Sequence, residues 1–159
     1  MKIDKKFKGL VNEGWRYRFD DDIETTESLE IDLDMGLFIT GSIEAGGFIK
    51  AGGSIEAGGS IEAGGSIEAG GSSGIVAGLS ITCKGTLSFG LKAFAGICSC
   101  REISEEEKTI TCGKLEGGVV EYGILKETGL EEDRKIELSM DEIAQKFGVA
   151  VKDLKIKKD

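Results

Sequence analysis

Isoleucine recurs every six residues through the middle of the chain, at Ile43, Ile49, Ile55, Ile61 and Ile67. Alanine follows each isoleucine two residues later, and a charged residue stands between the two. Because side chains on a strand alternate between its faces, isoleucine and alanine point inward and the charged residue outward. Two glycines then separate each unit from the next. A short strand and a turn every six residues predict a parallel β-helix of about 18 residues per three-sided coil.

The glycine pairs weigh against an amphipathic helix, since glycine has a low helix propensity and the period is six rather than 3.6. A disordered glycine/serine linker is the other alternative, and isoleucine at one fixed phase argues against it. We expect the glycine pairs to lie at the corners of each coil, because glycine adopts a positive φ at little steric cost.

Stacked coils place residues 18 apart directly above one another, about 4.8 Å apart. Glu44 is then expected over Glu62, a repulsive pair, and Lys50 over Glu68, an attractive one. The six-residue period extends backward to Leu37 and Ile31. Beyond a two-residue slip at Ser73 and Gly74 it resumes, and the second inward position grows from alanine to a larger side chain. The later positions are Ile75, Ile81 and Leu87 at the first inward site, with Cys83 and Phe89 at the second.

These patterns predict a mainly β chain in three parts: an N-terminal cap at 1–29, a β-helix at 30–125 and a small α/β lobe at 126–159. In the cap, alternation places Trp15, Tyr17 and Phe19 on one strand face, where their rings would cover the first coil. In the lobe, Ser139 and Glu142 form a capping box that opens a helix at 140–147, with a strand on either side.

The net charge of −9 is unevenly distributed. Residues 1–19 carry six basic and two acidic side chains, whereas residues 20–34 carry eight acidic ones and no basic one. An acidic protein is repelled by nucleic acid, so we expect no direct nucleic-acid binding. The acidic stretch favours a basic protein partner, including one that normally handles nucleic acid, or is simply a solvated face. No apolar run is long enough to span a membrane, and a soluble, cytoplasmic protein is expected.

The chain lacks residues that several kinds of catalytic site require. The chain has no histidine, no carboxylate pairs with an identifiable nucleophile, and we expect neither enzymatic activity nor a cofactor. The four cysteines are Cys83, Cys98, Cys100 and Cys112. Their C-x-C pair differs from the C-x₂-C of structural zinc sites, so small buried core residues are the favoured interpretation. A four-thiolate zinc site and a disulfide remain as alternatives.

Candidate partner-binding residues are the aromatic, basic and acidic side chains near the N-terminus and one ring within the repeat. Aromatic and arginine side chains commonly anchor interfaces, and Phe48 replaces the serine of its repeat unit, so it is either covered by the N-terminal strand or exposed. A homodimer is expected, because a strand edge or glycine-rich side favours a symmetric partner. The candidates are Trp15, Arg16, Tyr17, Arg18, Asp20, Asp21, Asp22 and Phe48.

The repeat sequences GSIEAG and GFIKAG resemble those of small hexapeptide-repeat proteins of firmicute phages and mobile elements. More distantly, residues 30–125 resemble bactofilins, which are polymer-forming bacterial β-helices. The first resemblance implies a phage-linked origin. Because small acidic phage proteins frequently inhibit host machinery, as anti-CRISPR proteins do, a non-enzymatic inhibitor is expected by analogy. The second implies a self-assembling scaffold. The repeat also resembles left-handed β-helix acyltransferases, but those enzymes depend on a histidine that this chain lacks.

Overall fold

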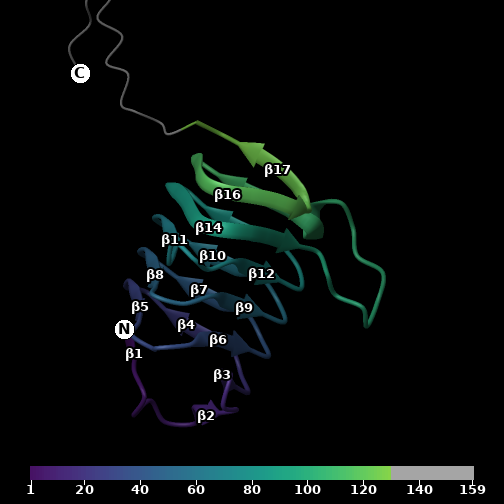
Figure 1. Ribbon diagram of the computed structural model, residues 1–159. Coiled ribbons are helices and arrows are strands. Elements are labelled where there is room, and N and C mark those ends of the chain that lie inside the picture. The colour runs from purple at the N-terminus through teal and green to yellow at the C-terminus, as the bar shows by residue number, and fades with distance from the viewer. Residues whose placement is uncertain (130–159) are drawn as a thin grey trace, which may run out of the picture.

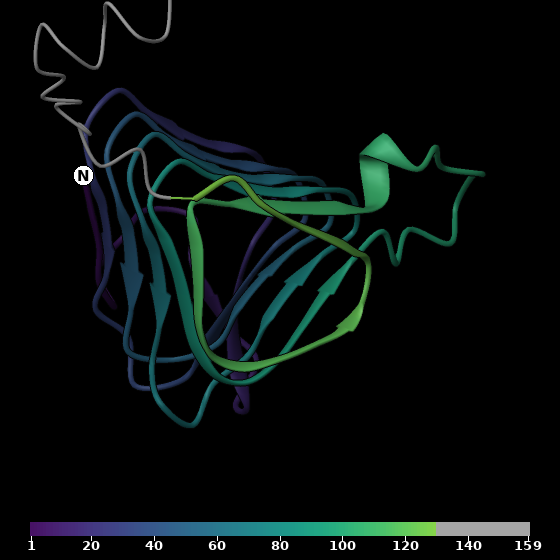
Figure 2. The ribbon, with the colours of Figure 1, turned by 90° about the horizontal axis from the view of Figure 1, so that it is seen from above.

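The computed structural model describes residues 1–129, which form a parallel β-helix, as the six-residue period predicts. Viewed along its axis the solenoid is a triangular prism, with the strands on three faces (Figure 2). The predicted helix and strands of the C-terminal lobe lie outside the described residues.

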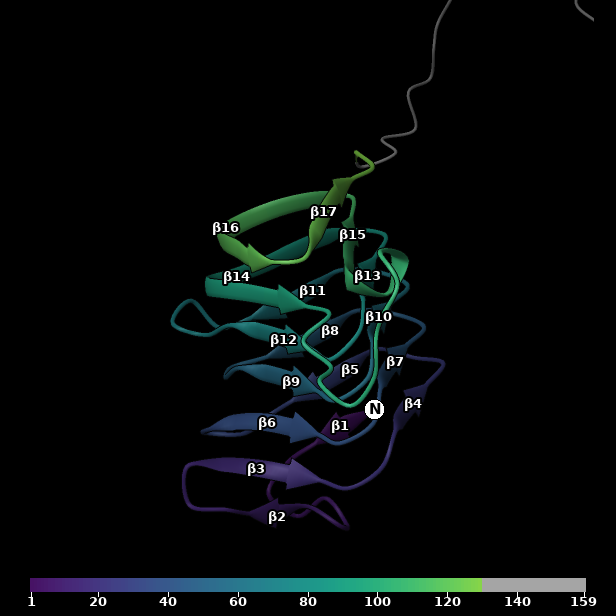
Figure 3. The same ribbon diagram turned by 90° about the vertical axis from the view of Figure 1, so that its right-hand side faces the viewer.

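Each face is a ladder of strands from successive coils (Figures 1 and 3). Face I contains β3 (Arg16–Phe19), β6 (Gly36–Ile39), β9 (Ile55–Ala57), β12 (Ile75–Ala77) and the ends of β14 (Thr86–Ala95) and β16 (Lys114–Tyr122). Face II contains β4 (Ile23–Thr25), β7 (Ile43–Ala45), β10 (Ile61–Ala63), β13 (Ile81–Cys83), β15 (Thr109–Cys112) and β17 (Ile124–Glu127). Face III contains β1 (Lys2–Ile3), β5 (Leu29–Ile31), β8 (Ile49–Ala51), β11 (Ile67–Ala69) and the beginnings of β14 and β16.

Stacking of like on like forms the core. Ile43, Ile61 and Ile81 stand above one another on face II, and all three are fully buried. The expected stacking of Glu44 on Glu62 is confirmed. The second inward position is alanine through the middle coils, and it enlarges to buried Cys83 and Phe89 as expected. The core therefore changes shape toward the later coils: its side chains enlarge on faces II and III, whereas on face I Ala93 stacks on Ile75.

One phase assignment from the sequence is wrong. Ile31 stacks beneath Ala51 and so occupies the second inward position, while Leu29 holds the first, beneath Ile49. Two additional residues at the corner before Leu37 shift the six-residue count, and buried Leu33 lies within that corner. A similar insertion precedes Ile75 at the same corner two coils later, where the slip was expected.

The repeat glycines do not act as expected. None of the glycines between residues 41 and 85 has a positive φ. Many of them are required instead because the coils approach closely: a Cβ at Gly64 would collide with the carbonyl group of Gly46 in the coil below. Gly58 and Gly78 face carbonyl groups in the same way. Space at these corners is limited by the backbone of the neighbouring coil and not by the turn within one coil.

The residue before the first inward position has a structural role at the corners. The hydroxyl of Ser42 accepts a hydrogen bond from the backbone N–H of Ser60 one coil above, at 3.1 Å. Ser66 does the same for Thr86 at 3.0 Å. In the first coil an aspartate takes this position, and Asp22 Oδ1 accepts from Ser42 N–H at 2.6 Å. The serines of the repeat thus connect consecutive coils.

The coils begin before residue 30, where the sequence places the boundary of the cap. Strand β3 pairs in parallel with β6, and β4 with β7, so residues 16–25 are part of the solenoid. Tyr17 and Phe19 occupy the inward positions beneath Leu37 and Ile39, and Trp15 lies outside the strand. The three rings therefore do not form one covering face.

The N-terminal end is closed by other residues. Antiparallel β2 (Val11–Asn12) pairs with β3 and ends the parallel ladder of face I. The ring of Phe7 packs edge-on against Phe19, with centroids 5.5 Å apart, and Leu10 also packs against the core. Apolar side chains from residues 4–12, rather than the tryptophan, therefore cover this end.

Candidate interaction faces

The outward side chains give each face a different chemistry. On face II the outward column begins with three carboxylates in register, Glu24, Glu44 and Glu62. The column then continues through Thr82 and Thr111 in the later coils. We call Glu24, Glu44 and Glu62 the acidic ladder.

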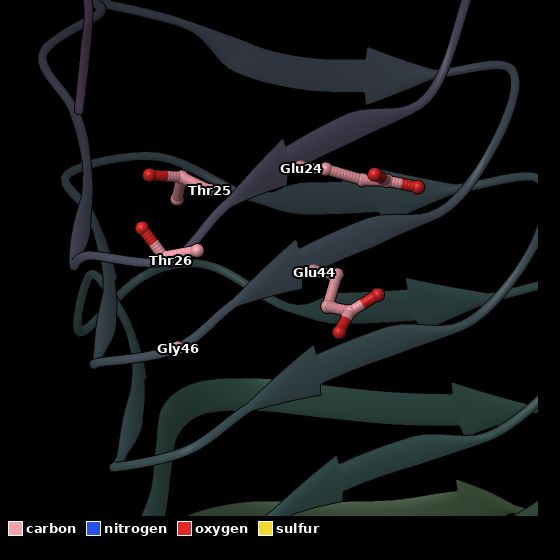
Figure 4. A pocket seen from close by; sticks show the side chains of 5 residues that line it. All are labelled: Glu24, Thr25, Thr26, Glu44 and Gly46. Carbon is pink, nitrogen blue, oxygen red and sulfur yellow. The ribbon is translucent and has the colours of Figure 1, made fainter.

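The acidic ladder has no counter-charge in the part of the chain that the structure describes. All three side chains are exposed, and none forms an ion pair with a residue of 1–129. Figure 4 shows Glu24 and Glu44 projecting from neighbouring strands beside a shallow hollow that Thr25, Thr26 and Gly46 complete. A second hollow follows the ladder to Glu62. Face II is therefore a hollowed surface with three uncompensated negative charges about 4.8 Å apart.

Face III is charged but compensated. Its outward column alternates in sign, with Lys2, Glu30, Lys50 and Glu68 in successive coils. The expected attraction between Lys50 and Glu68 is confirmed, with Nζ 3.2 Å from Oε2. Lys2 also reaches Asp32, at 2.7 Å. The same repeat unit thus produces a neutralised column on one face and an acidic ladder on another.

Face I is the aromatic face. Its outward column includes Phe38, Val76, Phe94 and half-exposed Tyr122. At its N-terminal end the guanidinium of Arg16 lies between two rings, 4.2 Å from the centroid of Trp15 and 4.4 Å from that of Phe38. Arg16 also pairs with Glu13 and Glu56. These contacts engage Arg16 within the chain.

The structure does not bring the predicted partner-binding residues together. Trp15, 66% exposed, and Arg16 lie at the start of face I. Arg18 pairs with Asp20 at 2.6 Å, and Asp21 and Asp22 follow at the corner between faces I and II. Phe48, 48% exposed, lies at the corner between faces II and III and is not covered by the N-terminal strand. The candidates are thus divided among three corners.

Two of those candidates have structural roles instead. Tyr17 is buried in the first coil, and its hydroxyl donates to Asp34 at 3.0 Å. Burial raises the pKa of Tyr17, and the hydrogen bond to Asp34 raises it further. Asp22 holds the first corner through Ser42, as described above. Neither side chain is therefore suited to an interface.

The acidic ladder was missed as a site because the first two coils are longer. Ile23 stacks beneath Ile43 at a separation of 20 residues rather than 18, so strict periodicity does not place Glu24 under Glu44. The signal was present in the triplet Ile23-Glu24-Thr25, which repeats the Ile-Glu-Ala pattern with threonine in place of alanine. Allowing a two-residue insertion at one corner would have aligned them.

The cysteines fall into two pairs of opposite environment. Cys83 and Cys112 are buried at second inward positions of face II, as expected of core residues. Burial raises the pKa of Cys83 to about 12 and also raises that of Cys112. Cys98 and Cys100, expected on a core strand, instead lie beyond the end of β14 in a surface loop. That expectation is wrong, because the chain leaves the solenoid after Ala95.

Comparisons with known proteins add no relative. The chain matches no protein-family model, no curated protein and no solved structure. Within residues 1–129, no three histidine, cysteine or acidic side chains are grouped to hold a metal ion. The same residues contain no helix long and apolar enough to cross a bilayer.

Proposed function

We propose that this chain is a non-enzymatic binding protein, a rigid β-solenoid that presents the acidic ladder to a basic protein surface. The observation that carries the proposal is the in-register column of Glu24, Glu44 and Glu62 with no ion-pair partner among the described residues. A partner that brings cations to this column relieves the repulsion between neighbouring carboxylates.

Rigidity supports the same proposal. The backbone of each coil is hydrogen-bonded to the next, so the spacing of the three carboxylates is fixed before binding. A preorganised surface loses little conformational entropy on association. The hollows along the ladder provide room for lysine or arginine side chains to reach the carboxylates. Basic side chains spaced like neighbouring strands of a sheet, about 4.8 Å apart, would match this face best.

Extending the resemblance of the repeat to phage proteins, we take the partner to be a basic, nucleic-acid-handling protein of the host cytoplasm. A row of carboxylates on a rigid face would compete there with the phosphates of nucleic acid. In this proposal the chain acts as an inhibitor by occupying a surface that otherwise holds nucleic acid.

The test compares two triple variants that remove the same number of charges. One neutralises the acidic ladder (E24Q/E44Q/E62Q), and the control neutralises three carboxylates of face III (E30Q/E68Q/E116Q). The probe is a fluorescent decalysine peptide, and its Kd is measured by anisotropy at low salt. We expect the Kd to rise about tenfold for the ladder variant and at most about twofold for the control. Equal effects would show that net charge alone, and not face II, attracts the peptide.

The alternative is a scaffold that polymerises end to end, as bactofilins do. Such a polymer needs parallel strand edges at both ends of the solenoid. On face I the N-terminal edge is occupied by antiparallel β2, which prevents a further parallel coil from adding there. This observation favours the binding protein over the polymer.

A further inference from the structure

The longest interruption of the solenoid is the loop between β14 and β15, residues 96–108, which projects from one corner of the prism (Figure 2). Ile81 and Ile110 stack directly although 29 residues separate them, compared with 18 between Ile43 and Ile61. The loop is anchored at its base, where Cys98 N–H donates to Gly78 O at 2.9 Å. Farther out, Arg101 makes a bidentate contact with Glu107.

This loop brings two thiols face to face at the surface. The Sγ atoms of Cys98 and Cys100 lie 2.8 Å apart, with Cys98 half-buried and Cys100 exposed. The two remaining cysteines, Cys83 and Cys112, are buried in the core. Thiol reactivity requires access and thiolate character, so the loop pair meets the first condition and the core pair does not.

The two loop thiols are also electrostatically unlike. The side-chain hydrogen bond with Cys100 lowers the pKa of Cys98, and the nearby guanidinium of Arg101 lowers it further. The same contact raises the pKa of Cys100. Cys98 therefore has the greater thiolate character, and Cys100 holds its proton more tightly.

We propose that Cys98 and Cys100 form a dithiol that reduces peptide disulfides stoichiometrically, in one thiol–disulfide exchange per chain. The Cys98 thiolate attacks one sulfur of the substrate disulfide, which forms a mixed disulfide and releases the other sulfur as a thiolate. Cys100 then loses its proton to solvent, and its thiolate attacks Cys98 Sγ. The second substrate thiolate leaves, and a Cys98–Cys100 disulfide remains. Two electrons pass from the dithiol to the substrate disulfide.

The surroundings of the pair indicate which disulfides fit. A mainly apolar hollow beside Cys98 is lined by Phe94, Ile97 and Tyr122, and also by Glu121, which pairs with Lys92. The loop itself carries four glutamates, Glu102, Glu105, Glu106 and Glu107, against two basic residues. These charges favour a disulfide with cationic or apolar neighbours over an anionic one such as oxidised glutathione.

The experiment uses the reduced full chain, the cationic disulfide cystamine and mass spectrometry after acid quenching. We expect the wild type to lose two hydrogens and to leave Cys83 and Cys112 unmodified. C100S should accumulate a mixed disulfide at Cys98, and C98S should react about tenfold more slowly than C100S. Serine is isosteric, and the loop lies outside the ladders, so circular dichroism should confirm an unchanged fold in both variants.

Two results would overturn the proposal: a wild type that accumulates stable adducts instead of the internal disulfide, or a C98S variant that reacts as fast as C100S. The substrate preference is tested by comparing cystamine with oxidised glutathione, each rate normalised to that of free dithiothreitol. We expect a normalised preference for cystamine of about tenfold at low salt, falling toward unity at about 0.5 M salt. Equal normalised rates at low salt would refute the preference for cationic disulfides.

Discussion

Replacing Gly64 by alanine tests whether the glycine pairs are required by the close approach of neighbouring coils. Gly64 has no positive φ, so alanine can adopt its backbone conformation. Its Cβ, however, would stand 2.9 Å from the carbonyl carbon of Gly46 and closer still to the oxygen. The carbonyl group belongs to the backbone and the Cβ is fixed to it, so neither can rotate away. The clash can be relieved only if the two coils separate.

The magnitude follows from that separation. Ordinary contacts of a Cβ begin at about 3.4 Å, so the carbonyl carbon alone requires the coils to part locally by about 0.5 Å, and the closer oxygen requires more. Gly64 N–H donates to Ala45 O at 2.9 Å in the same corner, and this bond lengthens as the coils part. Overpacking of a close-packed interior costs about 1–3 kcal/mol, and a rigid backbone acceptor places Gly64→Ala near the upper end. We therefore expect a loss of about 3 kcal/mol in the free energy of unfolding.

The control lies in the same repeat. A Cβ at Gly52 meets only Leu33 O, at 3.9 Å, which is an ordinary contact. Gly52→Ala should change stability by less than about 1 kcal/mol, and in the stabilising direction, because alanine restricts the unfolded chain. The assay is urea unfolding followed by far-ultraviolet circular dichroism, with the m-value compared between variants. Equal unfolding free energies for the two variants would refute the contact explanation.

Three further perturbations test other contacts. Asp22→Ala should cost about 1 kcal/mol by removing the acceptor for Ser42 N–H, and Asp22→Ser should restore most of it, since serine holds the other corners; equal urea midpoints would refute this role. Lys50→Glu would create three stacked carboxylates with Glu30 and Glu68, so its urea midpoint should fall at low salt and recover at high salt; a salt-independent loss would point to packing instead. The hydrogen bonds from Lys5 and then Tyr17 lower the pKa of Asp34. Asp34→Asn should therefore reduce the free energy of unfolding at pH values above the ordinary pKa of 3.8, and this loss should vanish as pH falls through the folded-state pKa. Urea midpoints measured across pH check this expectation.

The architecture was predictable because the six-residue period of the repeat corresponds to one strand and one corner of a coil. A fixed phase of isoleucine every six residues leaves few alternatives to a three-sided coil, and the stacking of Glu44 on Glu62 followed from arithmetic. Ile31 was assigned to the wrong inward position because a corner can contain two extra residues without disturbing the ladder. A buried leucine, Leu33, fills that corner, and the six-residue count alone does not show where such an insertion falls.

The surface was less predictable than the core. Tyr17 and Trp15 are two residues apart and were expected on one strand face, yet one is buried and the other is 66% exposed. The difference arises because β3 begins only at Arg16, so Trp15 lies in the preceding turn. The pairing of Cys98 with Cys100 depends on a loop that leaves the solenoid after Ala95, where the repeat pattern no longer applies.

The contrast between faces II and III bears on the proposed function. Both faces are built from the same repeat, so the fold does not dictate the residue between isoleucine and alanine, which points outward. On face III that position is lysine in Lys50, which lies between Glu30 and Glu68 and neutralises the column. On face II the equivalent Glu44 lies between Glu24 and Glu62 and adds to the repulsion.

A lysine in place of Glu44 would therefore pair with two carboxylates at no cost to the core. Stacked like charges reduce the stability of a sheet, and opposite charges increase it. Stability alone would favour the alternating column on both faces, but the chain has it on face III only. Within residues 1–129 the column on face II is uncompensated, which supports a role for its carboxylates outside folding, and a basic partner surface would supply counter-charges.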